Sequence, residues 1–476
     1  MASDGVLDSR VPIAAGFAFL GLSAVLSAAV GLPLYEDRAL YFLEILLERQ
    51  PLVPNQRFGA VIPQLPLVVA MDITDQVIFL RHVFSLGYGL LPLLSALLCW
   101  LVVRDSEREL MIFPTLFLAA NQINFSAVSE LLLSLYLAWP FLLLFSTRPT
   151  TSTTMVVGAA LAPLLFFLHP LSFLLLFFLG VLLLICPSDG GRESRARRSL
   201  AVLFMGLGLV RLLWALSSVN AYERSYLDSG SAAYYLFPDS SIQAAFLCSI
   251  LLLGLATAAR YWRASSTVRH QDAHRGPGNG GEPALNHGLR LLPETPWFSW
   301  TLAASTAVLG LAVAAQIHAG EGIKLKSAVV FPLALALMAI TVAAAGHARF
   351  QQSRTAWIPL FFLITLVYLL MGFSKAHGWQ RATDDLAAAM AASPSPCVRL
   401  GPDEPLVLQS ARMSAVDNWT APIAALIFQT EKPATLLLPG DGCQTLVEKR
   451  VAYFTPWFAR PLGALEARFG PIRVDQ

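Results

Sequence analysis

The segment TTMVVGAALAPLLFFLHPLSFLLLFFLGVLLLICP (residues 153–187) contains no Asp, Glu, Lys or Arg. His169 and Pro170 divide it into two apolar halves, each close to the length of about 20 residues that crosses a lipid bilayer as a helix. We therefore predict two short membrane helices, 153–168 and 171–187. They meet in a tight turn at His169, at the outer surface of the membrane.

The composition of the whole chain is typical of a protein that crosses a membrane many times. Its 476 residues are 56% hydrophobic and 13% charged, with a mean hydropathy of +0.60. Soluble proteins are about 45–50% apolar and about 25% charged, so this chain has too little polar surface for a water-soluble globule. Disordered, fibrous and disulfide-scaffold proteins are excluded as well. The formal net charge of +2 suggests no nucleic-acid partner.

Nine further apolar segments bring the predicted number of membrane helices to eleven. We predict that residues 1–375 form an all-α membrane domain. After Lys375 the residues Pro, Asp, Glu and Arg return, and residues 376–476 are predicted to form a small soluble α/β domain. The other nine predicted membrane helices are 11–32, 82–103, 110–122, 127–146, 199–218, 243–262, 299–317, 327–346 and 356–373.

The soluble domain contains candidate helices and strands. Helices are expected at Asp384–Ala392 and at Leu462–Phe469. Short apolar strands are expected at Leu406–Gln409 and Thr435–Leu438. This mixture predicts a small α/β unit without a catalytic constellation of its own, which would bind the acceptor or support the structure.

The five cysteines do not have the CxxC or Cys/His spacing of a zinc site. Cys397 and Cys443 lie near the starts of two candidate strands, in the domain that we predict to face an oxidising compartment. Disulfides form and persist in such compartments. We therefore predict a disulfide between Cys397 and Cys443, and no metal site.

The distribution of Arg and Lys between the loops predicts the orientation of the chain. The strongest basic cluster is RESRARR (192–198), and cytoplasmic loops carry an excess of Lys and Arg. With this cluster in the cytoplasm, the loops 33–81 and 219–242 and the residues after Lys375 lie outside. The first residues lack the basic start and cleavage site of a signal peptide, so the first helix is expected to be retained. We predict a multi-pass protein of the bacterial inner membrane.

The carboxylates favour chemistry at the membrane surface over transport. Ion-coupled transporters keep carboxylates near the middle of the bilayer, where the coupling ion binds. Within the predicted helices we find only Glu130, near an outer end, and Arg211, near mid-span. The carboxylates of the two outer loops are Glu36, Asp37, Glu44, Glu48, Asp72, Asp75, Glu223, Asp228 and Asp239.

The first outer loop, LPLYEDRALYFLEILLERQPLVPNQRFGAVIPQLPLVVA (32–70), combines several unusual features. An acidic pair and Arg38 follow the first helix directly. Apolar residues then recur at helical spacing, which predicts an amphipathic helix that lies on the membrane. A turn near Pro54 leads to a second Pro-rich apolar stretch, Pro63–Leu67.

In these features the chain resembles the GT-C membrane glycosyltransferases that use polyprenyl-phosphate sugars. It is most similar to the branch that contains the protein O-mannosyltransferases and the lipid A aminoarabinose transferases. In that branch the first helix is followed by an acidic pair, Arg, an aromatic residue and a surface helix, and then by a segment with Pro, Gly and Lys-Pro-Pro-Leu. The matching residues here are Glu36, Asp37, Arg38, Tyr41, Pro54, Gly59 and Pro63–Leu67.

A second similarity is the segment EGIKLKSAVVFPLALAL (321–337), which looks like the Gly-Lys…Pro-Leu-Ala-Leu stretch that opens a late helix in that family. Two departures are clear: Pro-Gln-Leu-Pro stands in place of the Lys-Pro-Pro core, and no Tyr follows Lys324 and Lys326 before Pro332. The resemblance implies a polyprenyl-phosphate donor and inversion at the sugar. It leaves the sugar and the acceptor open.

Transfer of a sugar from a phosphate needs a base that deprotonates the acceptor hydroxyl and positive groups that stabilise the leaving phosphate. Asp37, or its neighbour Glu36, is the candidate base. Arg81 and the two lysines suit the phosphate, although they suit snorkelling at helix ends as well. The candidate substrate-binding residues are Arg38, Arg57, Arg81, His82, His169, Glu223, Lys324 and Lys326.

The sequence therefore predicts a membrane glycosyltransferase that moves a sugar from a polyprenyl phosphate to a glycan, lipid or protein acceptor on the extracytoplasmic face. The expected partners are membrane lipids and the lipid-linked donor. No cofactor is expected besides the donor, and the need for a divalent metal is left open. The alternatives are a transporter of lipid-linked sugars or polysaccharides, and an enzyme like O-antigen ligases or polymerases with a diphosphate-linked donor.

Overall fold

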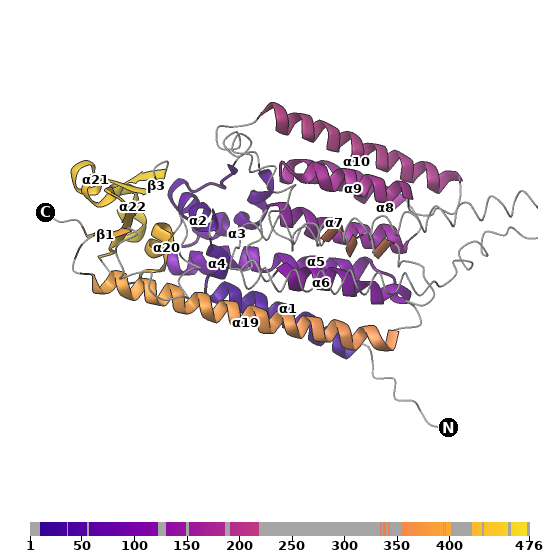
Figure 1. The fold of residues 1–476 in the computed structure, drawn as a ribbon, viewed down its shortest axis with the longest axis horizontal. Coiled ribbons are helices and arrows are strands. Elements are labelled where there is room, and N and C mark those ends of the chain that lie inside the picture. Colours follow the sequence, from indigo (N-terminus) through magenta and orange to yellow (C-terminus); the bar gives the residue numbers. More distant parts are fainter. Residues whose placement is uncertain are drawn as a thin grey trace, which may run out of the picture. The chain divides into compact units, whose positions relative to one another are not determined.

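The computed structural model is mostly helical, with a small α/β region near the C-terminus (Figure 1). The chain falls into two compact units, one formed by residues 1–218 and 348–476 and the other by residues 219–347. The residues that the structure describes are 10–35, 37–54, 57–121, 130–148, 152–185, 191–218, 334–335, 337–338, 341–342, 354–393, 395, 397–400, 421–430, 433–455 and 458–473. All contacts discussed below lie within the first unit.

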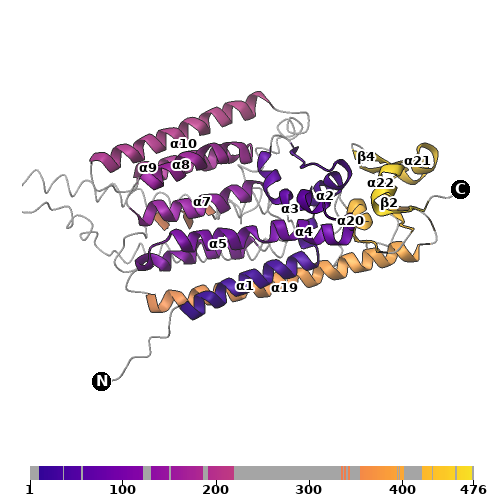
Figure 2. The same cartoon turned by 180° about the vertical axis from the view of Figure 1, so that it is seen from behind.

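Helices α1 (Arg10–Ala29) and α19 (Arg354–Ala392) lie side by side and run in the same direction (Figure 2). Near one end, the ring centroids of Phe17 and Phe361 are 6.0 Å apart. At the other end, those of Tyr35 and Trp379 are 5.8 Å apart. The two apolar helices therefore keep the same register over the length of α1.

Helices α4 (Val77–Gly89) and α5 (Leu91–Val102) follow one another and run antiparallel to α1. The ring centroids of Phe17 and Trp100 are 5.9 Å apart, and at the opposite end Nδ1 of His82 lies 3.4 Å from the carbonyl oxygen of Ala28. These contacts place the start of α4 beside the end of α1. The short helices η4 (Asp105–Met111) and α6 (Ile112–Asn121) come next.

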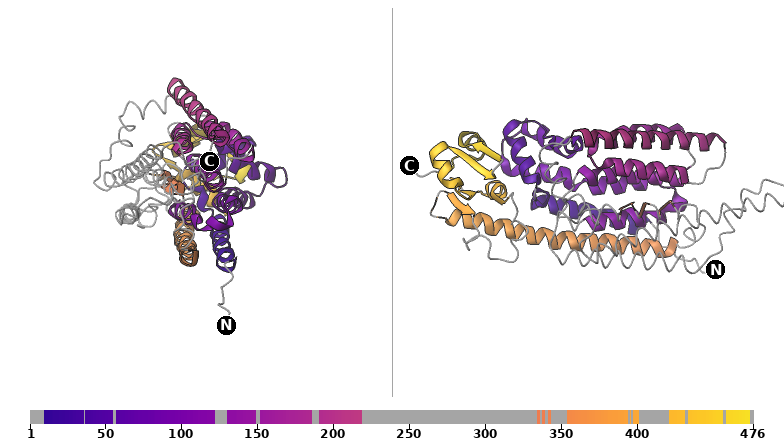
Figure 3. Two further views of the ribbon diagram at one scale, coloured as in Figure 1. Left: turned by 90° about the vertical axis from the view of Figure 1, so that its right-hand side faces the viewer. Right: turned by 45° about the horizontal axis from the view of Figure 1, so that its top comes forward.

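The other side of the bundle contains four apolar helices (Figure 3). The last of them, α10 (Gly191–Ser217), packs against the two helices before it, and its Phe204 ring stacks on Phe141 of the first, α7 (Glu130–Thr147), with centroids 5.6 Å apart. The cluster RESRARR (192–198) forms the first turns of α10 and is not a loop. Within it, Arg197 packs over the Phe145 ring and pairs with Glu193. The four helices are α7 (Glu130–Thr147), α8 (Ser152–Leu168), α9 (Ser172–Ile185) and α10 (Gly191–Ser217).

Several of these helices have the length and composition of membrane spans. Among the described residues, four helical stretches are long and apolar enough to cross a membrane: Val77–Val102, Glu130–Thr147, Glu193–Ser217 and Ile358–Ala392. Shorter apolar helices include α8 and α9, which meet at His169 as the sequence predicts. The predicted helices 243–262 and 299–317, and most of 327–346, lie outside the described residues, so the total of eleven spans stays a prediction.

The first loop folds into short helices that lie between the bundle and the C-terminal region (Figures 1 and 3). Gln64 closes the loop on itself: its side chain accepts a hydrogen bond from the Leu52 N–H (2.8 Å) and donates one to the Leu52 carbonyl oxygen (3.1 Å). Gly87 of α4 allows a close approach, since a Cβ there would lie 2.6 Å from the carbonyl oxygen of Pro63. The helices are η1 (Leu32–Leu34), α2 (Asp37–Glu48), η3 (Phe58–Ala60) and α3 (Val61–Met71).

The C-terminal region confirms the predicted α/β unit. Its two small sheets pair β1 with β2 in parallel and β3 with β4 antiparallel. The predicted strand at Thr435–Leu438 and the helix at Leu462–Phe469 are present, whereas Leu406–Gln409 lies outside the described residues. The elements are β1 (Cys397–Leu400), α20 (Ala421–Phe428), β2 (Leu436–Pro439), α21 (Gly442–Lys449), β3 (Val451–Thr455), β4 (Phe458–Pro461) and α22 (Leu462–Phe469).

Helix α19 has no break at Lys375, where the sequence places the domain boundary. It continues through the predicted helix Asp384–Ala392 as one element of 39 residues. At 1.5 Å per residue such a helix is about 58 Å long, whereas the hydrocarbon core of a bilayer is about 30 Å thick. Polar residues therefore return after Lys375 because the helix is longer than the apolar layer, and not because it ends there.

The predicted disulfide between Cys397 and Cys443 is confirmed, and it ties the start of β1 to α21. We expect a thiol reagent applied to the unfolded, non-reduced protein to leave both residues unmodified and to label Cys99, which is a free thiol. After reduction, both should react. Mass spectrometry of the labelled peptides checks this; labelling of Cys397 without reductant would contradict the bond.

Candidate functional site

Helix α2 begins at Asp37, immediately after the turn that follows α1. A carboxylate in the first turn is favourable because the N-terminal end of a helix carries partial positive charge. The Asp37 side chain is half-buried, whereas Arg38 is buried, with 3% of its surface exposed. The guanidinium carbon of Arg38 lies 5.6 Å from the ring centroid of Tyr88 in α4. Thus the start of α2 presents one accessible carboxylate and one buried cation.

The loop after α2 returns to the bundle at Gly59, which touches the end of α8. A Cβ at this position would lie 2.5 Å from the side chain of Leu168 and 3.2 Å from its backbone, so only glycine fits without displacement. This approach places Arg57 beside the first residue of α7: its Nη1 lies 3.9 Å from Oε2 of Glu130. Glu130 is buried, and an ion pair limits the cost of burying its charge.

Tyr41 lies between the start of α2 and the Arg57–Glu130 pair. It follows Asp37 by one turn and is on the buried side of α2. Burial raises its pKa well above the usual value, and the carboxylates of Glu130 and Asp37 raise it further, while the Arg57 guanidinium lowers it. The phenol is therefore neutral at physiological pH. It lies close enough to both carboxylates and to Arg57 to feel their charges.

His169 occupies the turn between α8 and α9 and is buried. The Leu171 N–H donates a hydrogen bond of 3.0 Å to its Nδ1, which assigns the remaining ring proton to Nε2. Burial lowers the pKa of His169 well below its usual value, and the charges of Arg57 and Arg211 lower it further. A neutral imidazole with an N–H donor at Nε2 follows.

Arg211, near the end of α10, contacts the backbone of His169. Its Nε donates a hydrogen bond of 3.4 Å to the His169 carbonyl oxygen. The guanidinium carbon lies 4.5 Å from the ring centroid of Trp214 and 5.7 Å from that of Phe166. Helix α10 extends from Gly191 to Ser217, so Arg211 lies less than two turns from its end, and its predicted position near mid-span of the membrane stays a prediction.

These groups form one connected arrangement at the end of the bundle nearest the C-terminal region, which we call the α2 polar cluster. It has three guanidinium groups against two carboxylates, and a neutral His169 leaves an excess of positive charge. Such an arrangement binds an anion and still offers a carboxylate as a base. Its members are Asp37, Arg38, Tyr41, Arg57, Tyr88, Glu130, His169 and Arg211.

The structure places two predicted substrate-binding residues in other contacts. The guanidinium carbon of Arg81 lies 4.7 Å from the ring centroid of Phe428 in α20, and His82 contacts the backbone of Ala28. Neither contact belongs to the α2 polar cluster. The remaining candidates, Glu36, Glu223, Lys324 and Lys326, lie outside the described residues, so their roles stay predictions.

Sequence reasoning did not assign Glu130, Arg211 or Tyr88 to the site. A signal was present for the first two, because a charged residue inside a membrane helix is costly and marks a functional site by default. Tyr88 carries no such signal, since a tyrosine in an apolar helix is common. In the part of the chain that the structure describes, no group of three or more His, Cys, Asp or Glu residues is arranged to hold a metal ion.

Comparisons of the chain with models of protein families, with curated proteins and with solved structures found no match.

Proposed function

We propose that the protein is a membrane glycosyltransferase that moves a sugar from a polyprenyl phosphate to an acceptor hydroxyl, with inversion at the sugar. The observation that carries this proposal is the position of Asp37, an accessible carboxylate beside buried Arg38, with Tyr41 near enough to Asp37 and to Arg57 to feel both charges. A base and a phosphate-binding group must lie close together for this reaction. The resemblance of the first loop to the GT-C enzymes supports the same chemistry.

In the proposed reaction, Asp37 takes the proton of the acceptor hydroxyl as its oxygen attacks the anomeric carbon. The new bond joins that oxygen to the anomeric carbon, and the bond from this carbon to the phosphate oxygen breaks. Polyprenyl phosphate leaves, and its phosphate oxygen keeps the electrons of the broken bond. Arg38 and Arg57 stabilise the negative charge that gathers on the leaving oxygen, and preorganised cations of this kind are often the largest contribution to rate.

The surroundings of the α2 polar cluster suit a lipid-linked donor. The apolar helix α7 begins at Glu130, and the apolar helix α8 ends directly before His169, so a donor with its chain in the bilayer would present its phosphate at this level. We further propose that this end of the bundle faces outward from the inner membrane of a bacterium. The acceptor then approaches from the side of the C-terminal region.

The transporter alternative receives less support from the charges. The charged residues Arg81, Glu130 and Arg211 each lie within two turns of an end of their helix. A coupled transporter needs them at the midplane, where substrate and ion bind. An enzyme with a diphosphate-linked donor remains the second candidate, because the same excess of positive charge would bind a diphosphate.

A donor assay separates these functions. We expect the purified protein in lipid nanodiscs to release free polyprenyl phosphate from a panel of polyprenyl-phosphate sugars and to transfer the sugar to lipid or glycan extracts. Polyprenyl-diphosphate sugars and nucleotide sugars should not react. Mass spectrometry of the lipid products measures both outcomes. Turnover of the diphosphate donors alone would favour the ligase-like alternative, and flux of intact donor in proteoliposomes without turnover would favour transport.

A further inference from the structure

The C-terminal region contacts α2 through a partly buried ion pair. Arg460 of β4 pairs with the carboxylate of Glu44 in the middle of α2. Arg460 is itself fixed by its own hairpin, since its Nη1 donates a hydrogen bond of 2.9 Å to the Ala459 carbonyl oxygen and its guanidinium carbon lies 4.7 Å from the Phe458 ring centroid. Helix α2 also packs against α20 and α22.

Glu44 lies on the same face of α2 as Asp37. Seven residues separate them, and at about 100° per residue seven steps return to within about 20° of the starting direction. Burial raises the pKa of the Glu44 carboxyl, while the hydrogen bond and charge of Arg460 lower it. Arg460 therefore contacts α2 on the face that carries Asp37.

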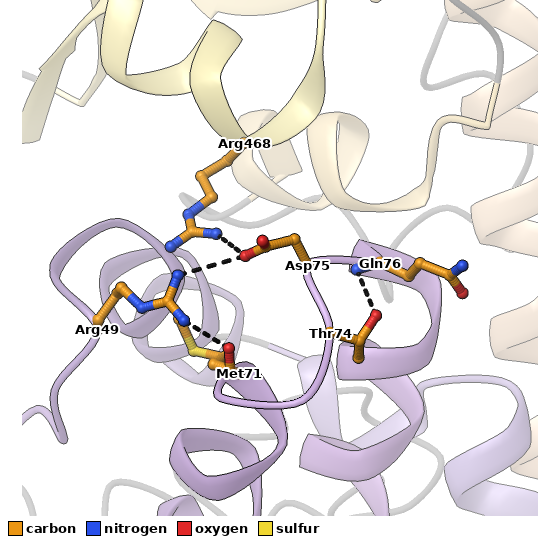
Figure 4. A network of polar contacts seen from close by, with 6 residues as sticks. All are labelled: Arg49, Met71, Thr74, Asp75, Gln76 and Arg468. Atoms are coloured by element: carbon orange, nitrogen blue, oxygen red, sulfur yellow. Dashed lines mark hydrogen bonds and ion pairs between the residues drawn. The ribbon is translucent and has the colours of Figure 1, made fainter.

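A second contact connects the same two regions just beyond the end of α2 (Figure 4). Asp75, which precedes α4, accepts from Arg468 of α22 and lies 3.3 Å from Nη1 of Arg49. Arg49 also donates to the carbonyl oxygen of Met71. The arginines lower the pKa of Asp75, with Arg468 as the larger cause. Because Asp75 is 72% exposed, this contact is screened by solvent and contributes little on its own.

We propose that Arg460 is a positioning residue for Asp37: through Glu44, the C-terminal region fixes the rotation of α2 relative to Arg57, Glu130 and His169. This inference rests on the proposed function for its catalytic consequence. Its mechanical part is that the stability of α2 depends on Arg460, and this part is inferred from the contacts alone.

The position of Asp37 matters because only Arg38 and Tyr41 of the cluster share its helix. Arg57, Glu130 and His169 belong to the start of η3, to α7 and to the α8–α9 turn. Loss of the ion pair would therefore move the base and Arg38 relative to Arg57, Glu130 and His169. Misplacement of a reacting group by about 1 Å costs up to about 10²-fold in rate.

The test uses the full chain in nanodiscs with Arg460→Gln, Glu44→Gln and the double variant. Arg460→Lys keeps the charge, and Arg450→Gln is the matched control, because Arg450 pairs with Glu466 inside the C-terminal region at 3.8 Å. Hydrogen exchange of the α2 amides measures the mechanical part. Sugar transfer from a polyprenyl-phosphate sugar, separated into kcat and KM, measures the catalytic part, and hydrogen exchange of the paired β3 and β4 amides reports that the region stays folded.

We expect Arg460→Gln and Glu44→Gln to speed exchange in α2 about tenfold and to lower kcat by about 10–100-fold with little change in donor KM. The double variant should be no worse than the worse single one, Arg460→Lys should recover part of kcat, and Arg450→Gln should match the unmodified protein. Unchanged exchange in Arg460→Gln overturns the proposal, as does faster exchange with unchanged kcat. Faster exchange in a protein that transfers no sugar in any form overturns the proposed function and leaves the mechanical link intact.

Discussion

Replacement of Asp37 by Asn is expected to lower sugar transfer by about 10²–10⁴-fold, the usual range for general-base catalysis. Asn has nearly the shape of Asp but does not accept a proton, so the acceptor hydroxyl keeps its hydrogen during the attack. The half-buried position of Asp37 at the start of α2 makes a large effect on folding unexpected. Single-turnover transfer from a polyprenyl-phosphate sugar measures the loss.

Two further variants make this result specific. Asp72→Asn is the matched control, because Asp72 is an exposed carboxylate at the end of α3 in the same loop; its transfer rate should stay within about twofold of that of the unmodified protein. Glu36→Gln tests the other member of the acidic pair. A large loss in Glu36→Gln alone would move the base to Glu36, and a loss of only a few-fold in both would remove the carboxylate from the reaction.

Arg57→Gln is expected to lower kcat/KM for the donor by about 10²–10³-fold, the cost of one preorganised group that stabilises the developing charge. The variant also leaves the buried Glu130 carboxylate without its ion pair, so some loss of stability accompanies the loss of rate. Initial rates over a range of donor concentrations measure the first effect, and thermal unfolding in nanodiscs measures the second.

The double variant Arg57→Gln/Glu130→Gln separates these effects. It removes both charges, so we expect it to recover most of the unfolding temperature while transfer stays low. If transfer recovers together with stability, Arg57 balances Glu130 and has no part in binding phosphate. A normal rate in Arg57→Gln itself would lead to the same conclusion.

Those features of the fold that depend on local pattern could be predicted from the sequence. The helix Leu462–Phe469 lies between Pro461 and Gly470, which mark its ends, and its predicted bounds are those of α22. The disulfide followed from two cysteines beside candidate strands in one domain. The apolar hairpin at His169 followed from composition and a His-Pro turn.

The ends of helices are harder to predict than changes in polarity. Polar residues return after Lys375, and the predicted domain boundary lies there, but the helix α19 continues to Ala392. Similarly, RESRARR reads as a loop because it is charged, but its arginines find partners on a helix, as the pair Arg197–Glu193 shows. Polar residues appear in a sequence both where a helix leaves apolar surroundings and where a helix ends, so the two cases look alike.

The α2 polar cluster could be predicted only in part. Asp37 and Arg38 follow from the acidic pair after the first helix, because they are neighbours in the chain. The approach of Arg57 to Glu130 and His169 depends on the contact of Gly59 with Leu168, which no local pattern encodes. For Arg81, the sequence places the residue at a helix end but does not say which side it faces, and that side holds Phe428.

The ion pair between Glu44 and Arg460 joins residues that are 416 positions apart in the chain. A ribosome adds about 5–20 residues per second, so Arg460 is made about 20–80 s after Glu44. Throughout that interval the nascent chain already holds the first loop and its carboxylates, but it does not yet have the arginine that fixes α2. The order of synthesis therefore delays the final placement of Asp37 until the last strand has been made, and a chain released early stays without it.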